Sequence, residues 1–394
     1  MEIRILKPEE NVLYGLISSV CFTYPLSKDY SEKLKNPLEH TENHENKIGC
    51  FNDKGELQAA LVIVPYKMQF NGETVDMAGI QGVATAPEAR FGGMMSKGMT
   101  ESLRIMHDRG YLLSTLYPFS FAYYRKFGYE QGYNINKASI DIDAFRSFPF
   151  PEGNVRLWKK GDDTKDLAEV YESFIKSRNY AINRNKENWG HILKDPYLDM
   201  TYTYIHYDDK GSPDSYIIFS PKKSDDDVAV ISEFAWKTKA GLFGMFGFIS
   251  GLRPQFSRIK WGVPDDIDVT SIFPEATHSN IRIESDFMVR IINLQGVLER
   301  LRPLGSGKVI LDIHDKSFDL NTGVYEVSWG DGIKVNKTDA SPDISTTIET
   351  MAQLAIGYST PQQAAYKTDT TIHKNMDGLS LLFPKRNLYI WEKF

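Results

Sequence analysis

A short loop in the first third of the chain carries residue types that could bind a phosphate group. The loop Arg90 to Met95 combines an arginine with the adjacent glycines Gly92 and Gly93. After it, four apolar residues recur at helical spacing: Met95, Met99, Leu103 and Met106. This spacing predicts a buried helix that starts directly at the loop. Because glycines at a helix N-terminus leave backbone N–H groups bare, the loop is a candidate site for a phosphate or a pyrophosphate.

The elements around this loop must hold it at the end of a strand. The run Ile80 to Thr85 has a strand pattern and leads through Pro87 into the loop. Gly110 supplies a stop for the helix, and Tyr111 to Tyr117 is the next predicted strand. The order of strand, glycine loop, helix and strand indicates a βαβ unit. The dinucleotide fingerprint and the Walker A loop are excluded, because the first needs three spaced glycines and the second a Gly-Lys-Ser/Thr ending.

This stretch resembles the acetyl-CoA loop of the GNAT N-acetyltransferases, whose pattern is Arg/Gln-x-x-Gly-x-Gly/Ala. Arg90 and Gly93 match that pattern, and Met95 departs from it. A second signature of these enzymes is an aromatic segment after the next strand, which is present as Tyr123-Tyr124-Arg125-Lys126-Phe127-Gly128-Tyr129. The alternative interpretation is an ordinary βαβ crossover with glycines in a tight turn.

Composition sets the class of protein. The chain has 394 residues, which is enough for two or three domains with sizeable cores. A net charge of −6 argues against nucleic acid as the main partner. The N-terminus has no apolar secretory segment, and the most apolar run, Gly241 to Leu252, is too short to span a bilayer. Since the only cysteines are Cys21 and Cys50, we expect a cytoplasmic protein without a membrane partner.

The first half of the chain has the pattern of a helix, a hairpin and the βαβ unit. We expect an N-terminal helix to turn three apolar residues inward: Val12, Leu16 and Val20. The apolar runs Leu61 to Phe70 and Glu73 to Ile80 are joined by Asn71-Gly72, the strongest short hairpin signal. The segment Ser147 to Pro151 contains two prolines and is predicted to be a linker.

The middle of the chain repeats the order of the first unit. A predicted strand (228–236), an apolar helix (242–252) and another strand (259–263) follow one another. The intervening loop, Lys237 to Gly241, lacks the Arg-x-x-Gly pattern, so we interpret this region as a second GNAT-like unit that has lost its cofactor loop. The remaining residues predict a small α+β unit, with a strand at 309–313 and a helix at 346–356.

The whole chain, of α+β class, resembles the Eis-type (enhanced intracellular survival) family of acetyltransferases. The resemblance implies a GNAT domain at 1–150, a degenerate GNAT-like domain at 151–288 and a sterol-carrier-protein-like domain at 289–394, assembled as a hexamer. The family loop Val-Ala-Val-Ala-Pro…Arg-Arg-Arg-Gly matches Val83-Ala84-Thr85-Ala86-Pro87…Arg90-Phe91-Gly92-Gly93. Phe91-Gly92 stands where the family has a basic pair.

The resemblance also assigns the residues of the reaction. It implies acetyl-CoA as the co-substrate, bound by Val83, Ala84, Thr85, Arg90, Phe91, Gly92, Gly93, Met94 and Met95. Tyr124 falls on the general-acid tyrosine of the family segment Tyr-x-Arg/Lys-Phe-Gly-Tyr, and the terminal carboxylate of Phe394 is expected in the active site. These roles suit the chemistry, because a tyrosine hydroxyl can protonate a thiolate and a backbone N–H can polarise a thioester carbonyl.

We therefore expect an N-acetyltransferase that moves an acetyl group directly to a primary amine of the aminoglycoside, polyamine or lysine type. Neither a metal nor a covalent intermediate is needed. Two alternatives remain. The chain could be a non-catalytic CoA-binding or lipid-binding protein, or a GNAT-fold aminoacyl transferase that uses charged tRNA.

Overall fold

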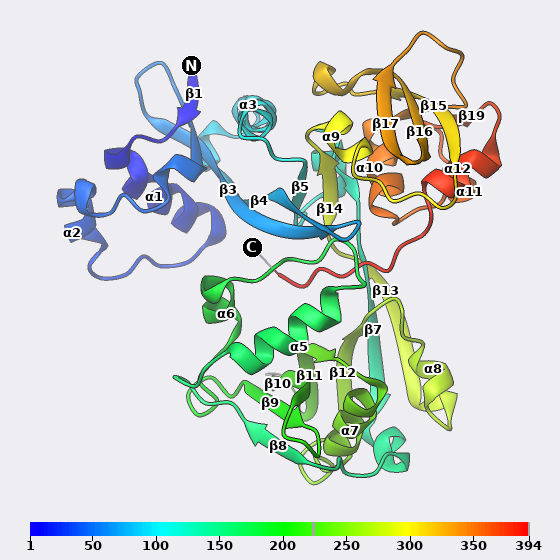
Figure 1. Ribbon diagram of the computed structural model, residues 1–394. Helices are drawn as coiled ribbons and strands as arrows, with labels where there is room; N and C mark the ends of the chain where they lie inside the picture. Colours follow the sequence, from blue (N-terminus) through cyan, green and yellow to red (C-terminus); the bar gives the residue numbers. More distant parts are fainter. Residues whose placement is uncertain (223–224, 393–394) are drawn as a thin grey trace.

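The computed structural model describes residues 1–222 and 225–392, which form three lobes around a common centre (Figure 1). Each lobe is built on one β-sheet, two of seven strands and one of five. Helices flank the sheets, so the predicted α+β class is confirmed. Within the described ranges, no helix is long and apolar enough to cross a lipid bilayer.

The first sheet has the strand order β1-β2-β3-β4-β5-β14-β6. Its strands are β1 (Glu2–Ile5), β2 (Lys47–Phe51), β3 (Leu57–Phe70), β4 (Glu73–Thr85), β5 (Leu113–Leu116), β6 (Glu130–Gln131) and β14 (Met288–Ile291). Its helices are α1 (Asn11–Phe22), α2 (Tyr30–Lys35), α3 (Met94–Asp108) and α4 (Phe121–Arg125). Because α3 connects β4 to the parallel strand β5, the predicted βαβ unit is confirmed.

Local sequence explains the two main features of this lobe. The turn Asn71-Gly72 has φ values of 52° and 79°, both positive as a type I′ turn requires, and it joins β3 to β4 as predicted. The four apolar positions expected to face inward from α3 are all buried. Gly110, at φ +80°, follows the end of that helix.

One expectation for the N-terminal helix is wrong. Val12 is buried in α1, but Leu16 is 36% and Val20 60% exposed. The helix instead buries Ile17 and Ser18 against the first sheet. Since α1 is apolar on more than one side, its hydrophobic spacing alone did not identify the face that packs.

The second sheet has the order β13-β7-β12-β11-β10-β9-β8. Its strands are β7 (Asn134–Asp141), β8 (Asn154–Leu157), β9 (Tyr202–Tyr207), β10 (Pro213–Lys222), β11 (Asp225–Trp236), β12 (Arg258–Val263) and β13 (Ser279–Ser285). Its helices are α5 (Lys165–Ile175), α6 (Lys186–Ile192), α7 (Lys239–Ser250) and α8 (Val269–Ile272). The helix α7 connects β11 to the parallel strand β12, which repeats the crossover of the first lobe as predicted.

The predicted linker at Ser147 to Pro151 is part of the second lobe instead. The ring of Phe148 lies 5.2 Å from that of Phe243 and 5.1 Å from that of Phe246. A Cβ on Gly247 would collide with the carbonyl group of Pro149. The prolines therefore interrupt regular structure, as expected, but Phe148 before them packs against the core of the second lobe.

Sheet membership also crosses the boundaries expected at residues 150 and 288. The strand β7 pairs with β12 and β13, so the second sheet begins at Asn134. The strand β14 returns to the first sheet, where it lies between β5 and β6. The second sheet thus contains a strand from before residue 150, and the first sheet contains one that begins at residue 288. Strand pairing, and not order along the chain, decides which strands share a sheet.

The third lobe is smaller and has the order β17-β16-β15-β18-β19. Its strands are β15 (Gly307–His314), β16 (Gly323–Gly330), β17 (Gly332–Lys337), β18 (Ile344–Thr347) and β19 (Thr371–Ile372). Its helices are α9 (Leu294–Leu298), α10 (Ile348–Ile356), α11 (Pro361–Ala364) and α12 (Met376–Leu382).

A buried ion pair joins the third lobe to the first. Nη2 of Arg290, on β14, lies 2.6 Å from Oδ2 of Asp315, and both side chains are fully buried. A Cβ on Gly128 would lie 2.7 Å from the guanidinium carbon of Arg290. Glycine at 128 therefore lets the arginine pack against the aromatic segment that contains Tyr124.

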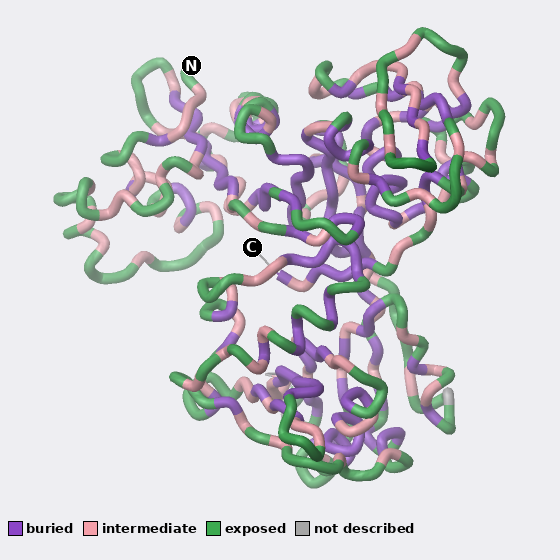
Figure 2. Tube along the Cα trace, in the orientation of Figure 1, coloured by how far each residue is buried: buried purple, intermediate pink, exposed green. Residues whose placement is uncertain are grey.

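The C-terminal tail leaves the third lobe and passes between the first and second (red in Figure 1). Asn179 pairs with Leu388 in a parallel bridge, and Met68 of β3 pairs with Ile182 in an antiparallel one. Three consecutive tail residues are buried: Leu388, Tyr389 and Ile390. Figure 2 shows this central crossing as buried. The tail therefore packs into the junction between the lobes and is held there by backbone pairing.

Candidate active site

A β-bulge in β4 interrupts the backbone pairing of the first sheet. Val62 of β3 pairs with Gln81 of β4, and the next pair is Ala60 with Ala84. Gly82 and Val83 therefore face a single residue of β3, which is a β-bulge. Gly82 has φ +59°, a conformation that favours glycine. A bulge leaves backbone groups outside the ladder, where they can contact a ligand.

The neighbouring strand separates from β4 at the same place. Four parallel pairs join β4 to β5, ending at Ile80 with Leu116. Residues 81–85 of β4 continue without a partner on β5. The bulge thus lies at the mouth of a V-shaped separation between two parallel strands, at the carboxyl ends where ligands bind in open α/β sheets.

The glycine loop brings the N-terminus of α3 to this opening. Gly93 is the N-cap residue, with φ +70°, and among the described residues no side chain caps the helix. A Cβ on Gly93 would meet no atom within 4 Å, and one on Gly92 only the carbonyl oxygen of Ala89 at 3.5 Å. The space beside these two glycines is therefore open, next to the helix end that carries the unpaired backbone N–H groups and the positive end of the helix dipole. This geometry fits a pyrophosphate.

The nine residues expected to bind the co-substrate all lie at this corner, but they offer different groups. Four are exposed: Arg90, Phe91, Gly92 and Gly93. Three are half-buried: Val83, Thr85 and Met94. The side chains of Ala84 and Met95 are buried in apolar clusters, so only their backbone is available. Nε of Arg90 donates to the carbonyl oxygen of Thr85 at 3.4 Å, which ties the loop to the strand.

Tyr124 lies on α4, whose N-cap Ser120 accepts a hydrogen bond from the N–H of Tyr123. The ring of Tyr124 is 3% exposed and contacts the rings of Phe119 and Tyr129. It belongs to the same apolar cluster as Val83 and Met94. Burial raises the pKa of Tyr124, so its hydroxyl is protonated at neutral pH. Among the described residues this hydroxyl has no hydrogen-bond partner, which leaves its proton available to a ligand.

A cleft of about 650 Å³ reaches Gln81, the residue before the bulge. Its walls come from α1, β2, β3, β4, α6 and the C-terminal tail. The lining is rich in polar groups: Tyr14, Asn43, Asn46, Lys47, Tyr66, Gln81, Asn185, Glu187, Asn188, His191 and Glu392. Another cleft, of about 710 Å³, lies on the second sheet and shares none of these residues, so the chemistry of β4 points to the former.

Tyr14 is placed directly over the bulge. A Cβ on Gly82 would collide with the hydroxyl of Tyr14, so glycine is required there for space as well as for φ. Burial raises the pKa of Tyr14, and burial lowers the pKa of Lys47, whose Nζ lies 5.5 Å from the centre of the Tyr14 ring. The sequence reasoning missed Tyr14. Tyr14, Ile17, Ser18 and Cys21 recur at helical spacing, but so do Val12, Leu16 and Val20, so the spacing alone did not single out the face of α1 that carries Tyr14.

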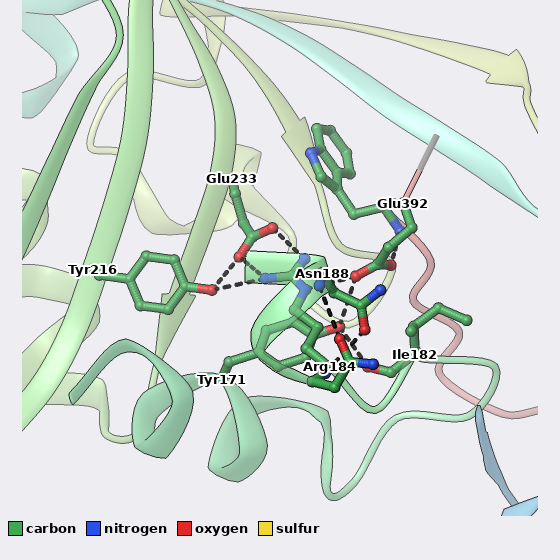
Figure 3. Close-up of polar contacts among 9 residues, drawn as sticks. Tyr171, Ile182, Arg184, Asn188, Tyr216, Glu233 and Glu392 are labelled. Atoms are coloured by element: carbon green, nitrogen blue, oxygen red, sulfur yellow. Dashed lines mark hydrogen bonds and ion pairs between the residues drawn. The ribbon is translucent and has the colours of Figure 1, made fainter. Parts of the chain in front are cut away.

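A buried cluster of charged residues fixes the C-terminal tail beside the cleft (Figure 3). Nη1 and Nη2 of Arg184 lie 2.6 and 2.5 Å from the two carboxylate oxygens of Glu233, and its Nε lies 2.6 Å from Oε1 of Glu392. The guanidinium carbon lies 3.8 Å from the ring centre of Tyr171. Arg184 and Glu233 are both 1% exposed. Since one guanidinium faces two carboxylates, the formal charge of the cluster is −1.

The carboxylate of Glu392 also affects the pKa of a residue that lines the cleft, Tyr66. Burial, and then the carboxylates of Glu392 and Glu187, raise the pKa of Tyr66 to about 12. Glu392 and Tyr66 both line the cleft. No motif in the sequence marked Arg184, Glu233 or Glu392. Phe394, which was expected to act through its carboxylate, lies outside the described residues.

Comparison with known proteins identifies the units. Residues 2–132 and 181–291 each match an acetyltransferase (GNAT) domain, and residues 294–391 match a sterol carrier protein domain. A relative from Streptomyces avermitilis, described as an uncharacterized N-acetyltransferase, is 20% identical over 332 residues, which cover 79% of this chain and 78% of that protein. The predicted tandem arrangement followed by a sterol-carrier-like unit is confirmed.

Two solved structures share this fold over their whole length. A GCN5-related N-acetyltransferase from Anabaena variabilis has a TM-score of 0.86 and 22% identity, with 100% of both chains covered. Eis1 from Mycobacterium abscessus has a TM-score of 0.82 and 16% identity, again with 100% of both chains covered.

Proposed function

Because the chain belongs to the GNAT acetyltransferase family, in the Eis-like arrangement, we propose that it transfers an acetyl group from acetyl-CoA to a primary amine. The observation that carries the proposal is the uncapped N-terminus of α3 next to the bulge of β4. The first element suits a pyrophosphate, and the second offers free backbone groups for a thioester carbonyl. Tyr124 shares an apolar cluster with Val83, which suits a proton donor for the thiol.

The proposed reaction is a direct transfer. The amine nitrogen bonds to the acetyl carbon, the carbon–sulfur bond breaks, the amine loses a proton to solvent or a carboxylate, and the sulfur takes the proton of Tyr124. A backbone N–H near Val83 to Thr85 stabilises the charge that develops on the carbonyl oxygen. Tyr124 holds its proton until the thiolate leaves, because burial keeps the hydroxyl neutral. The backbone of Gly92 to Met95 holds the pyrophosphate, with Arg90 beside it.

We propose that the acceptor amine occupies the cleft of about 650 Å³. The net negative charge of the Arg184–Glu233–Glu392 cluster attracts a cationic amine. The amide side chains of the lining, including Asn46, Asn185 and Asn188, can bind hydroxyl or amide groups of the acceptor. A polyamine, an aminoglycoside or a lysine side chain would each satisfy this chemistry.

The test is an assay of CoA thiol release with acetyl-CoA and three amine classes: a polyamine, an aminoglycoside and a lysine peptide. We expect release with at least one class and an acetylated product by mass spectrometry. Binding of acetyl-CoA without release for any amine would favour the non-catalytic alternative. Release of amino acid from a charged tRNA, in the absence of acetyl-CoA, would favour the aminoacyl transferase alternative.

The cytoplasmic location and the hexamer implied by the resemblance are also proposals. Exposed apolar residues of α1 support self-association, since Leu16, Val20 and Phe22 are exposed at 36%, 60% and 48%. Light scattering on the purified chain would give the mass of the assembly. A monomer at micromolar concentration would contradict the hexamer.

A further inference from the structure

Four cationic side chains surround a small cavity where the three lobes meet. The cavity has a volume of about 170 Å³ and lies next to the turn of the β3–β4 hairpin. Lys176 and Arg178 come from the segment after α5, and Arg302 and Arg386 come from the third lobe. No motif in the sequence brings these residues together, and none of them lines the acceptor cleft.

Most of this positive charge is uncompensated. Arg178 is paired with Asp266, with 2.7 Å between Nη2 and Oδ2. For Lys176, Arg302 and Arg386, no carboxylate lies within ion-pair distance in the part of the chain that the structure describes. A concave site walled by one sign of charge raises the local concentration of the opposite ion.

The two arginines of the third lobe are held close together. Nη2 of Arg386 donates to the main-chain carbonyl oxygen of Arg302. A Cβ on Gly72 would lie 2.5 Å from Nη1 of Arg302, so the guanidinium group rests against the hairpin turn. Burial, and then the charge of Arg302, lower the pKa of Arg386. Two neighbouring guanidinium groups without a carboxylate repel each other unless an anion lies between them.

Arg178 is the most buried of the four cationic residues. Its side chain is 7% exposed, and its guanidinium carbon lies 3.6 Å from the ring centre of Phe174. Nη1 donates to the carbonyl oxygen of Phe174 and Nη2 to Asp266, but Nε has no partner among the described residues. Arg178 therefore lines the cavity with a guanidinium group whose donors are not all satisfied by the described residues.

We propose that this cavity binds a small phosphate-type oxyanion, either free or as the phosphate group of a small ester. The cavity, with a volume of about 170 Å³, has room for a tetrahedral oxyanion. Guanidinium groups bind phosphate through paired N–H donors, which suits a site with three arginines. Because the walls come from separate lobes, a bound anion ties their junction together.

Calorimetric titration of inorganic phosphate into the full chain tests the site, at constant ionic strength and with CoA present to fill the α3 site. A parallel titration with glycerol phosphate tests the ester source. We expect saturable one-to-one binding of at least one probe. In the double variant Arg302→Gln/Arg386→Gln the affinity should fall at least 10-fold, whereas Arg302→Lys/Arg386→Lys should retain most of it.

A matched control replaces two exposed arginines elsewhere, Arg146→Gln/Arg282→Gln, which lowers the net charge equally and should leave phosphate affinity unchanged. Circular dichroism establishes that each variant is folded. No saturable binding of either probe to the parent chain would overturn the proposal, and so would equal affinity in the folded glutamine double variant. The acetyl-transfer proposal survives either result, because the thiol-release assay does not depend on this cavity.

Discussion

The two GNAT units build the same crossover but begin its helix in opposite ways. Both join parallel strands through a helix, β4–α3–β5 and β11–α7–β12, and both leading strands contain a bulge. In the first unit α3 starts at Gly93 without a side-chain cap. In the second unit Oγ1 of Thr238 accepts from the N–H of Gly241 at 3.0 Å, so the start of α7 is capped.

The second unit also fills the space that the first leaves open. Oγ1 of Thr238 donates to Asp214 at 2.7 Å, and a Cβ on Gly241 would lie 2.7 Å from the carboxylate of Asp214. A carboxylate of the chain therefore lies at the helix N-terminus, where the first unit has room for a phosphate. Where β11 and β12 part, the rings of Phe234 and Trp236 contact Trp261.

The first GNAT unit has features that suit ligand binding, and the second has features that stabilise the structure, although both have the same fold. The first unit keeps an unsatisfied helix end, an open strand bulge and small residues, which are costs unless a ligand uses them. The second unit satisfies its own helix end and instead supplies Arg184 and Glu233, which hold the tail at the proposed acceptor cleft. In the proposed function, the second unit is therefore a scaffold for the substrate side of the site.

The largest expected effect follows from removing the proposed proton donor of the first unit. Tyr124→Phe keeps the ring contacts and removes the hydroxyl, so kcat should fall by about 10²–10⁴-fold with the KM for acetyl-CoA little changed. Steady-state kinetics with the best amine measures both constants. Because burial raises the pKa of Tyr124, the parent enzyme should keep this proton at pH values near 10, where an ordinary tyrosine ionises.

Tyr123→Phe is the matched control, since this neighbouring ring lies 5.2 Å from that of Tyr124 on the same helix. It should retain most of the parent kcat. If the Tyr123 variant lost turnover and the Tyr124 variant kept it, the proton donor would have been assigned to the wrong residue.

The next effect concerns the open helix end. Gly93→Val places a branched side chain where the pyrophosphate should lie, so acetyl-CoA affinity should fall by about 100-fold, equivalent to about 3 kcal/mol of lost charge-assisted hydrogen bonds. Gly55→Val is a matched control. Gly55 also has a positive φ, +77°, and a Cβ added there would meet no atom within 4 Å, but it lies in the turn between β2 and β3.

The two valine variants should lose similar stability, because both force a branched residue into the left-handed region. Thermal unfolding of each, followed by equilibrium binding of acetyl-CoA, distinguishes strain from lost contacts. Equal affinity in the two variants would show that the loop does not bind the co-substrate.

A smaller effect tests the scaffold role of the second unit. Glu392→Gln removes the spare negative charge of the cluster but leaves Arg184 paired with Glu233. The KM for a cationic amine should rise by about 10-fold, since about 1.4 kcal/mol is lost from a partly buried charge attraction, while kcat and the KM for acetyl-CoA stay unchanged. Glu169→Gln, which alters a surface pair with Lys237, should change none of these constants.

The dependence of the amine KM on salt concentration is a second test of Glu392. The amine KM of the parent should rise with ionic strength, because screening weakens the same attraction, and that of the Glu392 variant should rise less. An identical salt response in both proteins would remove Glu392 from amine binding.

Local patterns predicted what depends on local physics. The hairpin at Asn71-Gly72, the buried face of α3 and the repeated crossover follow from turn chemistry and hydrophobic period, and the structure confirms them. The face of α1 was wrong, because a helix that is apolar on several sides does not reveal which face meets the sheet.

Contacts between distant residues were not predictable in the same way. Arg184 meets Glu233 and Glu392 across 49 and 208 residues of sequence, and no pattern in one chain links them. Tyr14 reaches the bulge only because Gly82, 68 residues later by their numbers, lacks a side chain. The sequence therefore suggested the proposed cofactor side of the site, whose residues are contiguous, but not the proposed acceptor side, whose residues come from separate elements.

The smallest expected effect comes from uncapping the second helix. Thr238→Ala removes the acceptor for the N–H of Gly241 and the donor to Asp214. The free energy of unfolding should fall by about 1 kcal/mol, the usual cost of losing an N-cap, and Thr238→Ser should restore it. Chemical denaturation measures this change.

If the second unit serves only as a scaffold, kcat and the KM for acetyl-CoA should stay at the parent values in both variants. A specific rise in the KM for acetyl-CoA in Thr238→Ala would mean that the capped helix still takes part in cofactor binding, and the division of roles between the two units would be wrong.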